Sequence, residues 1–163
     1  MDFFNQTGKL AIGSRLRMLT DKITVDAAAI YKMFGVDLKP KWFPVFFVLS
    51  RGEAKTITSI AKEIGHSHPS VSNIIKEMVA KGLVKETKDK SDGRRNMVML
   101  SAKGKRMSDS FSEQCIDVTA AIEQITQQTR NDLWEAIEEW ENLLLDKSLL
   151  ERVKIGRASC RER

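Results

Sequence analysis

The side chains that could do chemistry gather in a short polar stretch near the middle of the 163-residue chain. Between residues 67 and 76, hydroxyl, imidazole, amide and ammonium groups alternate with apolar residues. Such groups hydrogen-bond to phosphate oxygens and to the edges of nucleic-acid bases. The candidate residues for this role are Ser67, His68, Pro69, Ser70, Ser72, Asn73 and Lys76. Taken singly, each is an ordinary cap or surface residue, so the prediction depends on the element that carries them.

A helix-turn-helix pattern would position these residues. Thr58 is expected to cap a helix over residues 59–64, and Ser67 to cap a second helix over residues 68–81. The three residues between the helices include Gly65, and a turn of this length with a glycine is typical of the motif. The second helix should face inward with Val71, Ile74, Ile75, Met78 and Val79.

The N-terminal residues of the second helix are the ones that meet base edges in such a motif. Asn73 can pair with adenine through two hydrogen bonds, and Lys76 suits a phosphate. The free N–H groups of the helix N-terminus also favour a phosphate oxygen. Double-stranded DNA is therefore the expected partner of this face.

A β-hairpin with a basic tip is expected after the second helix. Residues 83–87 and 96–100 read as strands, and the segment between them has turn-forming Asp, Ser and Gly. Arg94 or Arg95 at the tip could enter the minor groove, with Asp89 and Asp92 as braces. The alternative is a solvated turn whose ion pairs contribute little.

The remaining elements are expected to be helices. A long amphipathic helix over residues 9–35 carries its apolar stripe through Ile12, Leu16 and Leu19, and the apolar run 42–49 reads as a buried helix. Ser101 should cap another long helix, and Thr129 should begin the last, with a stripe of Leu133, Ile137, Trp140 and Leu144. The predicted fold is mainly α with a small β-hairpin wing, a winged helix-turn-helix with long N- and C-terminal helices.

These stripes predict a homodimer. A compact domain of this size has a radius of gyration of only about 15 Å. Helices near 40 Å long cannot all bury their stripes inside it, whereas a twofold partner could cover them. The expected interface consists of Ile12, Leu16, Leu19, Leu133, Ile137, Trp140 and Leu144. An intramolecular bundle is the competing interpretation.

The charge is unevenly distributed along the chain. Residues 66–107 hold ten Lys and Arg against four Asp and Glu, whereas residues 108–154 hold four against eleven. A basic centre suggests a polyanionic partner, although lysines on helix surfaces are also commonly just solvated. Only two cysteines and no apparent signal peptide or membrane-spanning run lead us to expect a cytoplasmic protein without membrane contact.

No catalytic residue, metal site or cofactor is expected. His66 and His68 have a His-x-His spacing, but no further histidine or nearby cysteine completes a zinc set. No nucleophile elbow, phosphate loop or dinucleotide fingerprint is present. Cys115 lies on the inward stripe of its helix and is interpreted as a small buried hydrophobe rather than a redox sensor.

Four stretches of the central region resemble the MarR family of winged-helix transcription regulators: residues 67–73 (SHPSVSN), 81–84 (KGLV), 89–95 (DKSDGRR) and 98–104 (VMLSAKG). The resemblance implies a homodimer on a palindromic operator, with Arg94 in the minor groove and Asp89 as its brace. It also implies a small-molecule effector as a further partner. Gly93 and Asn73 depart from the family, which often has Arg at these positions.

The same resemblance sets the expected domain organisation. Residues 1–154 would form one MarR-like domain, with dimerisation helices at about 9–35 and 102–150 and a DNA-binding lobe at about 55–100. The chain also resembles the N-terminal module of MarR-like proteins that continue into a GNAT-type acetyltransferase, which gives an alternative function. Residues 155–163 resemble a translated sequencing adapter, so we expect a non-native tail there.

Overall fold

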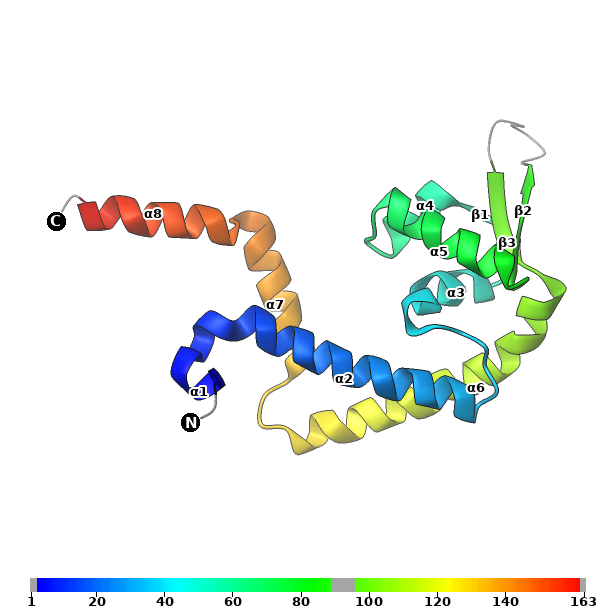
Figure 1. The fold of residues 1–163 in the computed structure, drawn as a ribbon, viewed down its shortest axis with the longest axis horizontal. Helices are drawn as coiled ribbons and strands as arrows, with labels where there is room; N and C mark the ends of the chain where they lie inside the picture. Colours follow the sequence, from blue (N-terminus) through cyan, green and yellow to red (C-terminus); the bar gives the residue numbers. More distant parts are fainter. Residues whose placement is uncertain (1–2, 89–95, 162–163) are drawn as a thin grey trace. The chain divides into compact units, whose positions relative to one another are not determined.

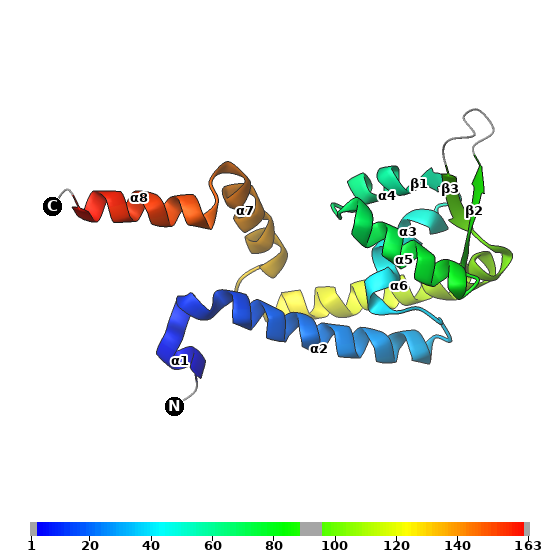
Figure 2. The same cartoon turned by 45° about the horizontal axis from the view of Figure 1, so that its top comes forward.

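The structure is a computed structural model that describes residues 3–88 and 96–161. The chain divides into two compact units, Met1–Ile116 and Asp117–Arg163, with helix α6 (Ala102–Gln128) crossing the boundary between them (Figures 1 and 2). The first unit contains α1 (Phe3–Thr7), η1 (Gly8–Ala11), α2 (Ile12–Met33), η2 (Pro40–Trp42), α3 (Phe43–Ser50), β1 (Lys55–Thr56), α4 (Ile57–Glu63), α5 (His68–Ala80), β2 (Val84–Lys88) and β3 (Asn96–Leu100). The second unit contains α7 (Leu133–Asp146) and α8 (Leu149–Arg161).

The expected fold class is confirmed: the architecture is a winged helix-turn-helix, in which α4 and α5 are followed by the β2–β3 hairpin. The three strands form one antiparallel sheet in the order β1-β3-β2. In the hairpin, Val84 lies opposite Leu100 and Lys88 opposite Asn96. The first strand of the hairpin, β2, begins one residue later than the sequence predicted, whereas the second strand, β3, matches residues 96–100. The expected helix over 42–49 is also present, and its first turn contains Pro44.

The core of the first unit forms where α3 and α5 pack against the sheet and the start of α6. The run Phe43–Ser50 has hardly a polar position, so this helix is covered on more than one side. The ring of Phe46 lies 4.8 Å from that of Phe111 in an edge-on contact, which brings α6 into the core. The largest fully buried side chains are Trp42, Phe46, Phe111, Leu49, Ile60, Ile75, Met78 and Leu83.

Two predicted helix caps are wrong. The cap of α4 is Thr56, not Thr58: its Oγ1 accepts the N–H of Ser59 at 3.1 Å, and its extended backbone continues from β1. The cap of α7 is Asp132, not Thr129: its carboxylate accepts the N–H of Glu135 at 3.0 Å. Both corrections have one reason, since the cap is the last extended residue before the helix, and several hydroxyl or carboxyl residues compete for that role.

The helices beyond the first unit differ from the prediction in one respect. The sequence predicted helical structure to about residue 150, but the structure ends α7 at Asp146 and begins α8 at Leu149. Helix α8 extends to Arg161, so it includes most of the segment interpreted as a tail. Among the described helices, none combines the length and apolar character needed to cross a bilayer.

A close approach of two backbone segments fixes the start of α6. Ser101 caps this helix as predicted, because its Oγ accepts the N–H of Gly104 at 3.1 Å. The Ser101 N–H in turn donates to the carbonyl of Leu83 at 2.9 Å, in the segment that joins α5 to β2. A Cβ at Gly104 would lie well inside van der Waals contact of that same Leu83 oxygen. Only glycine therefore fits at this position.

We predict that Gly104→Ala lowers the free energy of unfolding by about 1–3 kcal/mol, because the added methyl group must displace backbone. Chemical denaturation of the purified protein measures the change. The matched control is Gly156→Ala in α8, where a Cβ meets nothing within 4 Å. That variant should be neutral or slightly more stable, since alanine favours helix. Equal stability of the two variants would contradict the close approach.

Candidate nucleic-acid interface

The turn between α4 and α5 is built on Gly65, which has a positive φ of 66°. This conformation lets the His66 N–H donate to the carbonyl of Ala61 at 3.0 Å, the bond that closes a Schellman motif. The chain then reverses within a few residues and enters α5. The glycine predicted from the sequence is thus the residue that sets the geometry of the helix-turn-helix.

Ser67 begins α5 as its N-cap, as predicted. Its Oγ accepts the backbone N–H of Ser70 at 3.4 Å, and its hydroxyl donates to the Ser70 hydroxyl oxygen at 2.9 Å. Pro69 lies in the first turn, where its missing N–H costs no hydrogen bond. Ser67 is therefore occupied in shaping the helix start, and the side chains beyond it are left to face outward.

Helix α5 separates into a buried and an exposed face. Val71, Ile75 and Met78 are fully buried. Most of the predicted contact residues lie on the other face and are exposed: Ser67, His68, Pro69, Ser70, Asn73 and Lys76. Ser72 is half-buried. Val79, which was expected to face inward, is exposed, because Met78 is the last residue of α5 that is buried in the core. The structure thus brings the polar set together over the first turns of one helix.

A carboxylate that the sequence analysis missed fixes α5 to the preceding segment. The Trp42 Nε1–H donates to Oε2 of Glu77 at 3.0 Å, and the Lys41 ammonium donates to Oε1 at 2.6 Å. The Lys39 ammonium lies 3.5 Å from the same carboxylate. These hydrogen bonds, from Lys41 first and Trp42 next, lower the pKa of Glu77 to about 2. The only sequence signal was an acidic residue isolated in a basic region.

Other acidic residues form ion pairs with some of the basic side chains. Asp37 lies 4.0 Å from the Lys81 ammonium and 3.9 Å from that of Lys103. In the same way, Glu63 pairs with Lys55 at 2.9 Å and with Arg51 at 3.5 Å. By contrast, Lys76 on α5 forms no ion pair within the described part of the chain. The local excess of positive charge is therefore only partly available to a ligand.

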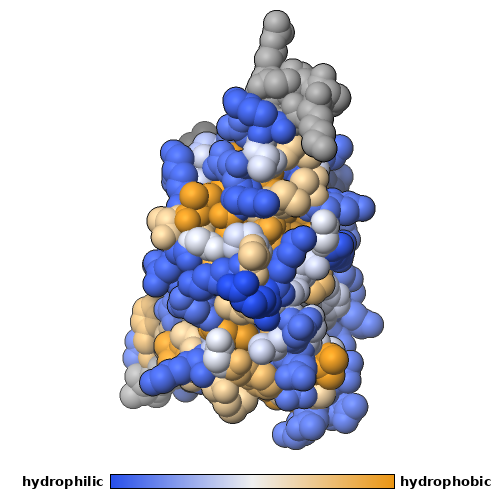
Figure 3. Space-filling view, turned by 90° about the vertical axis from the view of Figure 1, so that its right-hand side faces the viewer, coloured by the Kyte–Doolittle hydropathy of each residue, from blue (hydrophilic) through white to orange (hydrophobic). Residues whose placement is uncertain are grey.

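The wing is described up to the ends of its strands. Asn96 donates through its side-chain amide to Glu86 at 3.4 Å, across the β2–β3 pair. Polar side chains dominate the face that carries this hairpin, with apolar areas between them (Figure 3). The predicted tip residues Asp89, Asp92, Arg94 and Arg95 lie outside the described residues, so their roles stay predictions.

His66 and Cys115 contact neighbouring parts of the first unit. Nδ1 of His66 lies 3.0 Å from the carbonyl oxygen of Ile64, at the end of α4. In residues 3–88 and 96–161, no cluster of three or more His, Cys, Asp or Glu side chains could hold a metal ion. Cys115 packs against the core of the first unit, and its burial raises the pKa of the thiol. This location agrees with its interpretation as a small hydrophobe.

Residues 36–95 match the sequence model of the MarR family. The chain contains a MarR-family domain. The matched range covers α3, the helix-turn-helix, β2 and the predicted tip of the wing. Among curated protein sequences, none matches this chain. The family model gives no support to the resemblance to acetyltransferase fusions.

Several solved structures share the fold of this chain over most of its length. The transcriptional repressor CouR, bound to a 23-mer DNA duplex, has a TM-score of 0.63 and 20% identity, covering 85% of this chain and 96% of that chain. PcaV from Streptomyces coelicolor, in complex with its natural ligand, has a TM-score of 0.61 and 13% identity, covering 83% and 92%. A probable transcriptional regulator from Pseudomonas aeruginosa has a TM-score of 0.59 and 17% identity, covering 82% and 96%. At these identities the likeness is one of fold.

We predict that Glu77→Gln makes the folded protein less sensitive to acid between pH 4.5 and about 2. The folded-state pKa of Glu77 is lowered from 4.5 to about 2, so its contribution to stability is present above pH 4.5 and is lost as the pH falls through that window. Urea denaturation at about pH 5 and about pH 3 measures the free energy of unfolding. The control is Glu113→Gln, an exposed glutamate of α6. If both variants keep the parent's pH dependence, Glu77 does not form this anchor in solution.

Proposed function

We propose that the protein is a transcription regulator that binds double-stranded DNA through α5. One observation carries the proposal: the exposed polar face over the first turns of α5 directly follows a helix-turn-helix turn inside a MarR-family domain. A helix in this position enters the major groove with its N-terminal residues toward the bases. The DNA duplex bound to CouR, a protein of the same fold, gives further support.

The contacts on α5 divide into base reading and phosphate binding. Asn73 is exposed and can offer a donor and an acceptor to adenine. Lys76 lies about one turn further along the helix and suits a phosphate oxygen. Ser70 and His68 at the helix start lie where backbone phosphate meets the free N–H groups of the first turn. Ser67 contributes by capping, and half-buried Ser72 is a secondary contact.

The wing would supply the second contact. Arg94 and Arg95 at the predicted tip would enter the narrow minor groove, where a guanidinium group is favoured by the negative potential. Asp89 and Asp92 would brace these arginines. The strands β2 and β3 are paired over their full length, so they form a stiff support for such a tip.

We propose that the protein binds DNA as a homodimer. Leu16 and Leu19 on α2 are 44% and 40% exposed, and Ile137 and Trp140 on α7 are 40% and 54% exposed. Apolar side chains that recur along helices and remain open to water favour a partner, because their burial contributes about 25 cal/mol per Å². The other members of these stripes are also exposed: Ile12, Leu133 and Leu144. A twofold dimer would present two α5 helices to a palindromic operator.

We further propose that the protein binds a small-molecule effector, and the proposal names this class of partner without naming the compound. PcaV was solved with its natural ligand, and its fold is shared by this chain. Regulators of this kind respond to a ligand when the ligand binds the DNA-competent and the DNA-free states with different affinity. The DNA proposal does not depend on the effector.

We predict that Arg94→Ala weakens DNA binding by about 1–3 kcal/mol and flattens its salt dependence, since the contact of a positively charged side chain with the minor groove is lost.

We predict that Lys76→Ala reduces the slope of log affinity against log salt by about one, at every DNA sequence. The DNA is first selected from a random pool, and fluorescence anisotropy at several salt concentrations then gives the affinities. Lys22→Ala on α2 is the charge-matched control and should leave the slope unchanged. Parent-like slopes in both test variants would remove the wing and α5 from the interface.

We predict that Leu16→Glu combined with Ile137→Glu converts a dimer into monomers, because each protomer would bury two unpaired carboxylates at the interface. Analytical ultracentrifugation at micromolar concentration measures the mass. Leu145→Glu, at an exposed position of α7 outside the stripe, should leave the dimer intact. A monomeric parent protein would overturn the dimer proposal without touching the DNA-binding face.

A further inference from the structure

Glu77 on α5 contacts the linking segment, residues 34–42, which connects α2 to α3. Its carboxylate accepts hydrogen bonds from the Trp42 indole at 3.0 Å and from the Lys41 ammonium at 2.6 Å. We propose that Glu77 is a positioning residue: its bond to Trp42 fixes the orientation of α5, and sequence-specific DNA binding depends on that orientation. This role rests on the proposed DNA-binding function, since Glu77 lies outside the predicted set of DNA contacts and acts through α5.

The Trp42 indole is the fixed end of this contact. The side chain is 1% exposed and packs in the core of the lobe, directly before the first turn of α3. A buried indole N–H requires a hydrogen-bond partner, and Glu77 supplies it. Rotation or sliding of α5 would remove the carboxylate and leave a buried donor unsatisfied, which costs more than the loss of an exposed contact. The bond therefore resists movement of α5 relative to α3.

Glu77 lies on the same side of α5 as the proposed base contact. Asn73 precedes it by four residues, and residues at this spacing are neighbours on a helix surface. Asn73 is exposed, whereas Glu77 is half-buried and Met78 beside it is fully buried. A rotation of α5 at Glu77 would therefore carry Asn73 away from the geometry that two hydrogen bonds to adenine need.

Ion pairs between the linking segment and α5 favour a single register. Lys39 lies 3.5 Å from Glu77, whereas Asp37 lies 4.0 Å from Lys81, about one turn further along the helix. A shift that carried Glu77 to the place of Lys81 would bring its carboxylate beside that of Asp37, and like charges repel. Asp37 and both lysines are exposed, so each pair contributes little to stability. Their effect is to disfavour the wrong register, while the Trp42 bond fixes the correct one.

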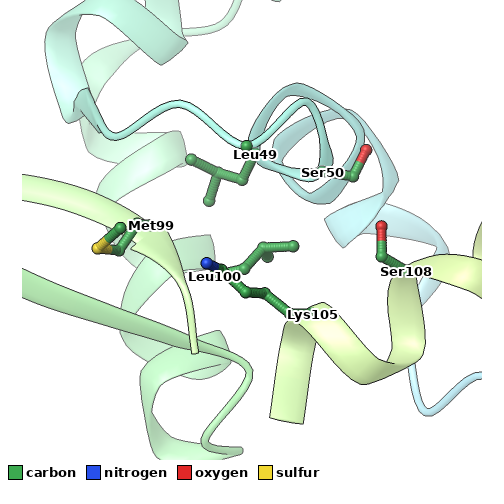
Figure 4. A pocket seen from close by; sticks show the side chains of 7 residues that line it. Leu49, Ser50, Met99, Leu100, Lys105 and Ser108 are labelled. Atoms are coloured by element: carbon green, nitrogen blue, oxygen red, sulfur yellow. The ribbon is translucent and has the colours of Figure 1, made fainter. Parts of the chain in front are cut away.

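Apolar packing does not by itself fix the position of α3. A pocket of about 300 Å³ borders the C-terminal end of this helix, next to β3 and the first turns of α6 (Figure 4). Leu49 of α3, Leu100 of β3 and Lys105 of α6 are among its lining residues. Apolar contacts have no preferred direction, so helices beside such a space can adjust. The directional bond at the N-terminal end of α3 therefore has the larger influence on how α5 is held.

Loss of Glu77 would have two separable effects on DNA affinity. Removal of a negative charge from α5 should strengthen binding to any duplex, because attraction to phosphates is independent of sequence. Loss of the correct orientation should weaken binding only where bases are read. The two effects have opposite signs on specific DNA, so a net loss of specific affinity identifies a positioning role rather than a charge effect.

The experiment compares a duplex that the parent protein selects from a random pool with a scrambled duplex of the same length. Fluorescence anisotropy at one salt concentration gives both affinities, and their ratio is the specificity ratio. Glu77→Ala should bind the selected duplex about tenfold more weakly and the scrambled duplex no more weakly than the parent does. Trp42→Phe, which keeps every charge, should lose affinity for the selected duplex alone. Glu77→Gln retains an acceptor oxygen for the indole and should recover most of the specificity ratio.

Stability is separated from positioning by the same ratio. A partly unfolded variant loses affinity for both duplexes alike, so its specificity ratio does not change. The matched control is Glu63→Ala, which removes the same charge from the helix-turn-helix, although Glu63 pairs with Lys55 and Arg51 and not with α5. Its ratio should equal that of the parent.

Three outcomes would overturn the positioning role. An unchanged specificity ratio in Glu77→Ala and Trp42→Phe would do so and leave the proposed function standing. A Glu77→Gln variant as impaired as Glu77→Ala would contradict the route through Trp42. A parent protein that does not distinguish the two duplexes would overturn the proposed function and the role of Glu77 with it.

Discussion

The attachment of α5 to the rest of the lobe is the constraint on which the candidate interface depends. Its apolar face is fixed by Val71, Ile75 and Met78 in the core, and Glu77 receives hydrogen bonds from Trp42 and Lys41 on the solvent side of that core. The first contact holds the helix against the lobe by burial, which does not specify direction. The second supplies direction, because a carboxylate that accepts from the buried Trp42 ring and from Lys41 limits rotation and sliding of the helix. Base readout requires both.

Ion pairs, as well as position in the sequence, determine where positive charge remains open to a ligand in this protein. Glu77 on α5, Glu63 on α4 and Asp37 each engage two basic side chains. The basic side chain in the middle of α5, Lys76, has no such partner among the described residues. Exposed ion pairs contribute little to stability, so their larger effect here is to decide which positive charges remain open to a polyanion.

The apolar surface is distributed in two ways that serve different ends. In the winged-helix lobe, apolar residues close into a continuous core around Phe46 and Phe111. Along α2 and α7, apolar residues instead form stripes that stay open to water in the single chain. A long helix with one apolar stripe cannot cover itself, so its sequence already implies a partner surface.

The sequence by itself determined the order of the elements, the helix-turn-helix, the exposed face of α5 and the strand over residues 96–100. These follow from local rules: glycine at a positive φ, a serine cap, and the periodicity of apolar residues. Only the tertiary structure decided that Thr56 and Asp132 are the caps, that Ser72 turns partly inward, and that Glu77, Trp42 and Lys41 meet. The reason is physical. The Glu77 contacts join groups that are 35 or 36 residues apart, and the caps depend on competition between similar neighbouring residues. The spacing of residues along the chain predicts neither outcome.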